Sequence, residues 1–161
     1  MSFASLAAAA KAAALGGRGA VRALELRGSG DLECRNLMCE RLGEACACRL
    51  ARFVQQTPLR ELETLDVSES GLRALPGAVY ECLPALRELR AGGNALQDIA
   101  PDVRLLTELR VLDLSRNRIS ALPLGELLGL PRLERLVLVG NPAAAALRRS
   151  MPPALAAKTE V

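Results

Sequence analysis

The chain has 161 residues, half of them hydrophobic, and a formal net charge of +3. This length is enough for one domain with a hydrophobic core, and so small a charge argues against a surface built mainly for nucleic acids or membranes. With two Phe, one Tyr and no Trp, the core must be filled by leucine-sized side chains, and no apolar run is long enough to predict a membrane span.

The first 24 residues contain no acidic residue and are rich in alanine. The stretch from Ala4 to Leu15 predicts a helix, which Gly16-Gly17 would end. Two interpretations stay open: the helix caps the first layer of the domain, or the segment is a mitochondrial presequence, which is also basic and poor in acidic residues. We favour the cap because the first predicted strand follows so closely.

The first predicted strand lies in the stretch "VRALELRGS" (Val21–Ser29). Further on, apolar residues fall three to four positions apart, which predicts a helix from Leu37 to Gln56 that Pro58 closes. Whether the 41 positions from Val21 to Leu62 hold one strand unit or two stays open. The apolar face of the predicted helix comprises Met38, Leu42, Cys46, Leu50, Phe53 and Val54.

The next units repeat one pattern, in segments that begin at Leu62, Leu86, Leu109 and Leu133, at intervals of 24, 23 and 24 residues. The Leu109 copy, "LRVLDLSRNRI", has leucines spaced by three and then by two, followed by an asparagine. Neither an ordinary helix nor a two-sided strand needs this uneven spacing. Each copy therefore predicts a short strand with its leucines in one core, and the copies stack as a parallel sheet.

The pattern LxxLxLxxNxL with this period resembles the leucine-rich repeat family. The resemblance implies an α/β solenoid, a short right-handed arc of about five coils with a parallel concave sheet, a helical N-terminal cap and a long helix in the first repeat. That first repeat is similar to those of ribonuclease-inhibitor-type proteins, although it is long even for them. Asn94, Asn117 and Asn141 would form a ladder between coils, with Ser70 as a weaker substitute.

We interpret residues 1–161 as a single domain. Residues 1–20 are the cap helix or targeting segment, 21–58 the long helix-bearing repeat, 59–141 the typical repeats, and 142–161 the C-terminal cap and tail. The stretch "GNPAAAALRRSMPPAL" resembles the C-terminal cap of intracellular members of the family. The final residues, Lys158–Val161, also fit the peptides that add a strand to PDZ domains, a loose pattern that arises often by chance.

The predicted concave sheet is the surface that such solenoids usually use for binding. The alternative for any single charged residue is that it pairs across strands and only keeps this face soluble. The residues that we predict to bind a protein partner are Glu25, Thr64, Asp66, Glu88, Arg90, Val111, Asp113, Arg135 and Val137.

The chemistry of the sequence does not favour an enzyme. No histidine is present, so no Ser-His or Cys-His nucleophile pair can form, and no glycine-rich phosphate loop precedes a helix. Cys34, Cys39, Cys46 and Cys48 crowd into one stretch, but they lack the paired spacing or the histidine partners of most zinc sites. We expect no cofactor and no metal. Cys48 faces away from the apolar side of the helix.

The sequence therefore predicts a non-catalytic protein–protein interaction module, an adaptor or scaffold that serves as a subunit of a larger assembly. The alternatives are an accessory subunit of a mitochondrial complex and an organellar ribonucleoprotein component that contacts RNA. Only the arginine bias supports the RNA contact, and a GC-rich gene produces the same bias. Five cysteines without a secretory signal favour an intracellular location, cytoplasmic or mitochondrial.

Overall fold

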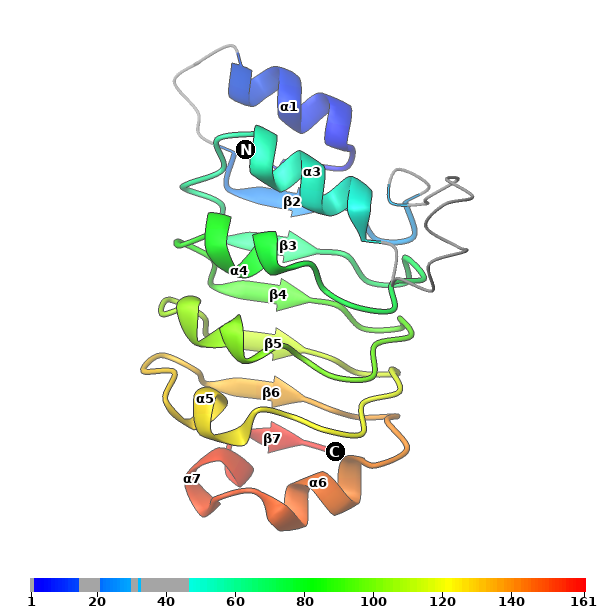
Figure 1. The fold of residues 1–161 in the computed structure, drawn as a ribbon, viewed down its shortest axis with the longest axis vertical. Helices are drawn as coiled ribbons and strands as arrows, with labels where there is room; N and C mark the ends of the chain where they lie inside the picture. Colours follow the sequence, from blue (N-terminus) through cyan, green and yellow to red (C-terminus); the bar gives the residue numbers. More distant parts are fainter. Residues whose placement is uncertain (1, 15–20, 30–31, 33–46) are drawn as a thin grey trace.

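The computed structural model describes residues 2–14, 21–29, 32 and 47–161. These residues form one parallel sheet of seven strands whose spatial order follows the order along the chain (Figure 1). The strands are β1 (Ser2–Phe3), β2 (Ala23–Glu25), β3 (Thr64–Asp66), β4 (Glu88–Arg90), β5 (Val111–Asp113), β6 (Arg135–Val137) and β7 (Thr159–Glu160).

The register of the sheet places equivalent leucines of successive coils side by side. The middle residues of β2 to β6 are all leucine, they pair across every strand boundary, and each is fully buried. This confirms the predicted fold class, a solenoid of about five coils whose leucines share one core. The aligned leucines are Leu24, Leu65, Leu89, Leu112 and Leu136.

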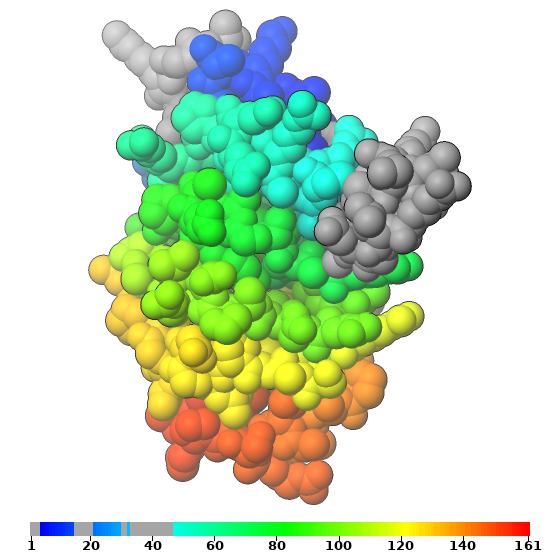
Figure 2. Space-filling model, in the orientation of Figure 1, coloured from blue at the N-terminus to red at the C-terminus, as the bar shows by residue number. Residues whose placement is uncertain are grey.

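Helical segments cover one face of the sheet and leave the other face open (Figure 1). Their length and type vary from coil to coil, because each only has to return the chain while burying a few side chains. In the space-filling view the coils follow one another as successive bands (Figure 2). The covering segments are α1 (Leu6–Ala14), α3 (Cys48–Gln56), α4 (Gly77–Cys82), the 3-10 turn η2 (Pro101–Leu105) and α5 (Leu124–Leu128).

The N-terminal segment packs on the first coil. Helix α1 begins at Leu6, after the predicted start at Ala4, and it buries Leu6 and Ala9 in the common core. The predicted end at Leu15 and Gly16-Gly17 lies outside the described residues. The sequence did not predict β1, whose Ser2 and Phe3 pair with β2. The outer edge of β2 is therefore paired with residues from the N-terminal end of the chain.

The long first repeat contributes one strand to the sheet, since β2 pairs directly with β3. Of the helix predicted from Leu37 to Gln56, the structure describes the second half as α3, and residues 33–46 lie outside the described residues. Leu50, Phe53 and Val54 are buried on α3, on the predicted apolar face. None of the helices in the described ranges has the length and apolarity that a bilayer crossing requires.

The asparagine column joins the coils through side-chain hydrogen bonds. The amide nitrogens of Asn94, Asn117 and Asn141 donate to the carbonyls of Val67, Ala91 and Leu114 in the preceding coil, at 2.8–2.9 Å. Their amide oxygens accept backbone N–H groups of that same coil, including those of Leu72, Leu96 and Ile119. Ser70 keeps the donor bond of this arrangement, from its hydroxyl to the Leu26 carbonyl at 3.2 Å.

The C-terminal segment closes the other end of the core. Helices α6 (Ala144–Ser150) and α7 (Pro153–Ala156) bury Leu147 and Leu155. The chain then adds β7 to the sheet, so that the amides of Leu136 and Leu138 donate to the Lys158 and Glu160 carbonyls. The buried Thr159 hydroxyl donates to the Leu155 carbonyl at 2.8 Å.

Candidate functional site

The open face of the sheet carries the residues that the sequence predicts to bind a partner. We use "open face" for the strand side chains on the side away from the helices. All nine predicted residues lie there, and the register aligns them in two columns. One column contains Thr64, Glu88, Val111 and Arg135; the other contains Glu25, Asp66, Arg90, Asp113 and Val137.

A hollow of about 450 Å³ lies on this face. Seven of the nine predicted residues line it, whereas Glu25 and Thr64 lie outside, toward the N-terminal coils. The predicted lining residues are Asp66, Glu88, Arg90, Val111, Asp113, Arg135 and Val137, and the structure adds Arg27, Ser68, Gly92, Ser115 and Arg116.

Most of the added residues form a third column, directly after the last inward-facing residue of each coil: Arg27, Ser68, Gly92 and Ser115. The sequence prediction missed them because it considered exposed columns only up to the position between the second and third leucine-type residues. The repeat alignment contained the signal, since the LxxLxLxx pattern has two further variable positions before the asparagine. In the coil of β4 this position is Gly92, whose missing side chain leaves room for the Ser115 hydroxyl.

The second of these positions has left-handed backbone in all five coils. Glycine occupies it at Gly28, Gly93 and Gly140, but Glu69 and Arg116 occupy it in the other two, with φ of 56° and 50°. A left-handed backbone costs a residue with a Cβ about 1–2 kcal/mol. The two exceptions carry opposite charges.

These two residues belong to an ion triad at the edge of the hollow. Glu69 accepts two bonds from Arg27, the shorter at 2.8 Å, and one from Arg116 at 3.2 Å. The Glu69 side chain extends past Gly93, where a Cβ would lie 2.9 Å from its Cγ. Hydrogen bonding and charge from Arg27 lower the pKa of the Glu69 carboxyl. The triad therefore spans from the first coil to the fourth across the glycine pair of the third.

The other arginines on the floor of the hollow are also paired. Arg90 bonds Glu88 at 2.7 Å on the same strand, and Arg135 makes two bonds, of 2.6 and 2.9 Å, to Glu160 of β7. The hydrogen bonds from Arg135 lower the pKa of the Glu160 carboxyl. These arginines therefore pair with carboxylates of the same face, which is the alternative that the sequence left open for single charged residues.

The two aspartates on the floor have a different environment. Asp66 accepts the Ser68 amide at 2.9 Å and Asp113 accepts the Ser115 amide at 2.8 Å, each through Oδ1. These bonds shape the chain where it leaves the strand. Among the ion pairs of the described residues, neither aspartate has a cationic partner within 4 Å. Neither aspartate is therefore held in an ion pair, although Asp66 and Asp113 act at longer range on Arg27 and Arg135, whose pKa values they help to raise.

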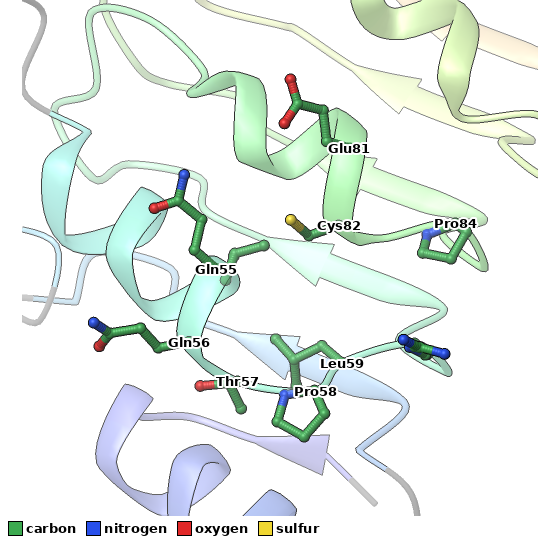
Figure 3. Close-up of a pocket in the computed structure, with 10 residues that line it drawn as sticks. Gln55, Gln56, Thr57, Pro58, Leu59, Glu81, Cys82 and Pro84 are labelled. Atoms are coloured by element: carbon green, nitrogen blue, oxygen red, sulfur yellow. The ribbon is translucent and has the colours of Figure 1, made fainter.

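A second hollow, of about 560 Å³, lies between the C-terminal end of α3 and α4. Figure 3 shows Gln55 from α3 and Cys82 from α4 on facing sides of it, with Pro58 and Leu59 below. Cys82 is half-buried, and Cys48 at the start of α3 is exposed. Cys34, Cys39 and Cys46 lie outside the described residues.

Comparisons with known proteins agree on one kind of repeat. The family model described as "Leucine rich repeat" matches residues 92–142. Mouse Nephrocan is 43% identical over 83 residues, which cover 51% of this chain and 16% of that protein. The mouse PH domain leucine-rich repeat-containing protein phosphatase 1 is 32% identical over 126 residues, which cover 78% of this chain and 7% of that protein.

The fold is also similar to a solved leucine-rich repeat protein of Leptospira interrogans. The TM-score is 0.60 at 22% identity, over 88% of this chain and 36% of that one. The chain thus spans less than a fifth of either curated relative and about a third of the solved structure.

Proposed function

The chain belongs to the leucine-rich repeat family, and on that premise we propose that it is a non-catalytic module that binds a protein partner on the open face. Proteins of this family generally mediate protein–protein interaction. The observation that carries the proposal for this chain is the hollow on the open face, which gathers seven predicted residues from four adjacent strands.

The composition of the face supports binding without catalysis. The hollow is lined by side chains with exposed ion pairs, which an open surface does not desolvate enough for acid–base chemistry. The face also has an apolar part, because Val111 and Val137 lie in the hollow and Val139, 46% exposed, follows β6. A partner can bury this part.

We further propose that the module works as an adaptor or scaffold within a larger assembly. Five coils offer an area near the roughly 800 Å² per partner of a standard interface. Such an area suits one contact among several better than a stand-alone receptor of high affinity. An intracellular location, cytoplasmic or mitochondrial, is part of the same proposal.

A mitochondrial accessory subunit is the second candidate, and the acid-free residues 1–24 support it. Against cleavage of this segment stands the packing of α1, whose Leu6 and Ala9 belong to the core. A fusion of residues 1–24 to a fluorescent protein tests this candidate. Transport into mitochondria supports it, and a diffuse cytosolic signal excludes this segment as a sufficient signal.

An RNA contact within an organellar ribonucleoprotein is a weaker candidate. It needs arginines that are available to phosphate groups, whereas those on the floor of the hollow already pair with carboxylates. Binding to RNA that falls steeply with added salt would support it.

Site-specific photo-cross-linking in intact cells tests the surface itself. A photoreactive residue at Val111 on the open face should give protein adducts, whereas one at Leu105, 42% exposed on η2, should not. Adducts from Leu105 alone would move the binding surface to the helix side.

Charge reversal supplies a second readout of the same surface. Asp66→Arg with Asp113→Arg should abolish the Val111 adduct. Because both aspartates also accept backbone amides, circular dichroism must show that the doubly substituted chain remains folded.

A further inference from the structure

The distribution of charge over the hollow indicates the chemistry of its partner. We propose that the open face recognises a basic protein segment, with one arginine or lysine side chain pairing with Asp113 and a second pairing with Asp66. This inference rests on the proposed function, because it names the partner class of the same surface.

The first step in the argument concerns which charges remain available. Arg27 and Arg116 share Glu69, Arg90 pairs with Glu88, and Arg135 pairs with Glu160 through two bonds. An acidic partner would have to displace these carboxylates. It would also meet two aspartates that carry no neutralising ion pair in the described part of the face. A basic partner meets neither obstacle, so charge complementarity favours it.

The second step concerns hydrogen-bonding capacity. Each aspartate uses Oδ1 on a local amide, Ser68 for one and Ser115 for the other. The second carboxylate oxygen has no hydrogen bond to the protein in the described structure. A guanidinium or ammonium group supplies donors that match such acceptors.

The third step concerns access to Asp113. A Cβ built on Gly92 would lie 2.8 Å from Ser115 Oγ and 3.5 Å from Asp113 Oδ1. Gly92 has no positive φ, so the missing side chain leaves room for the Ser115 hydroxyl instead of relieving backbone strain. With no side chain at position 92, both Ser115 and Asp113 line the hollow, where a cation of the partner can reach them.

The fourth step sets the spacing of the two cations. Asp66 and Asp113 both pair in register with Arg90, so they lie two strands apart, about 10 Å at the usual strand spacing. Residues seven positions apart on a helix are separated by about 10.5 Å along its axis. A helical segment with basic residues at that interval matches the two carboxylates.

The test uses three labelled probes measured by fluorescence anisotropy. One is an alanine-based helical peptide of about 18 residues with arginines seven positions apart, the second has glutamates instead, and the third is a polyuridylate oligonucleotide. We expect the arginine peptide alone to bind the intact chain. Asp66→Asn with Asp113→Asn keeps the Oδ1 acceptors but removes both charges, and should weaken binding about tenfold, the sum of two exposed ion pairs.

A side chain at position 92, beside Ser115 and Asp113, gives an independent variant. Gly92→Leu should weaken binding of the arginine peptide at least as much as the double asparagine variant does. Gly125→Leu, whose side chain meets open space on α5, should leave binding unchanged. Thermal unfolding of both leucine variants confirms that they are folded. If Gly92→Leu unfolds the chain, the double variant Asp66→Asn with Asp113→Asn alone tests the inference.

Three results would overturn the inference: no binding of the arginine peptide, equal binding by the asparagine variant, or preference for the glutamate peptide or the RNA. The cross-link at Val111 separates this failure from failure of the proposed function. An adduct with an acidic segment would leave the function standing and reject the basic partner. Absence of any adduct at Val111 would reject the binding surface itself.

Discussion

Single residues at equivalent positions in the coils differ in how many neighbours they join. The buried Asn117 contacts two coils, donating to Ala91 and Leu114 and accepting from Leu96. Ser70 in the same column donates through its hydroxyl to the Leu26 carbonyl of the first coil. A hydroxyl has one donor hydrogen whereas a side-chain amide has two, so Ser70 can link fewer backbone groups than Asn117.

Asn117→Ala should destabilise the fold by about 3 kcal/mol, because it leaves buried backbone groups of two coils without partners. Asn117→Ser should cost less, since a hydroxyl can still donate to the Ala91 carbonyl as Ser70 does to that of Leu26. Urea denaturation measures both variants. Equal losses of stability in the alanine and serine variants would show that the hydrogen bond to the Ala91 carbonyl contributes little.

Tyr80 predicts a specific response to alkali. Its side chain is 1% exposed, and its hydroxyl has no hydrogen-bond partner among the described residues. Burial raises the pKa of the phenol far above its usual value of about 10, and the charges of Asp98 and Asp102 add to the rise. The folded chain therefore holds this proton more tightly than the unfolded chain does.

Below about pH 10 the phenol is neutral in both states, so its contribution to stability is fully present there. Above that pH the unfolded chain loses the proton first, and stability should fall by up to about 1.4 kcal/mol per pH unit. Tyr80→Phe should remove this loss and leave the neutral-pH stability unchanged or up to about 1 kcal/mol higher. Tyr80 is the only tyrosine in the sequence, so tyrosinate absorbance reports on it directly. Ionisation near pH 10 without unfolding would contradict the prediction.

At the scale of elements, no strand is stable alone, because β2 to β6 have three residues each and gain their stability from stacking. The helical segments that connect the strands differ in length and type, from the nine-residue α-helix α3 to the 3-10 turn η2. The end strands β1 and β7 have two residues each. They satisfy the backbone groups that β2 and β6 would otherwise expose.

The β7 strand also bears on the predicted PDZ-type tail. Binding to a PDZ domain by strand addition would require Thr159 and Glu160 to leave β6. Thr159→Val keeps the side-chain shape but removes the bond to the Leu155 carbonyl, and should destabilise the cap by about 1 kcal/mol. Hydrogen exchange at Leu136 and Leu138 measures it, because their amides donate to this segment. Unchanged exchange would mean that the hydroxyl does not hold β7 in place.

At the scale of the whole molecule, the chain behaves as a one-dimensional stack in which each coil contacts its neighbours. Leu112→Ala in the fully buried middle of β5 should cost about 2–5 kcal/mol. The loss should appear first as faster amide exchange in β4 and β6, and only then in β2. Uniform acceleration across all strands would instead indicate one fully cooperative unit.

The amino-acid sequence alone determined the coil. The uneven leucine spacing can be satisfied only by strands that bury every leucine on one side, so it predicts the solenoid, the stacking of the strands and the residues on the open face. It could not predict β1 or β7, because two-residue strands such as Ser2–Phe3 have no periodicity of their own and form only beside an existing edge.

Only the tertiary structure decided how the charges on the open face are shared. Glu69 reaches Arg116, 47 positions away in sequence, past the glycine pair of the intervening coil. Arg90 turns to Glu88 on its own strand instead of to the aspartates beside it. These choices depend on side-chain direction and on the space left by Gly92 and Gly93, which arise only when the coils are stacked.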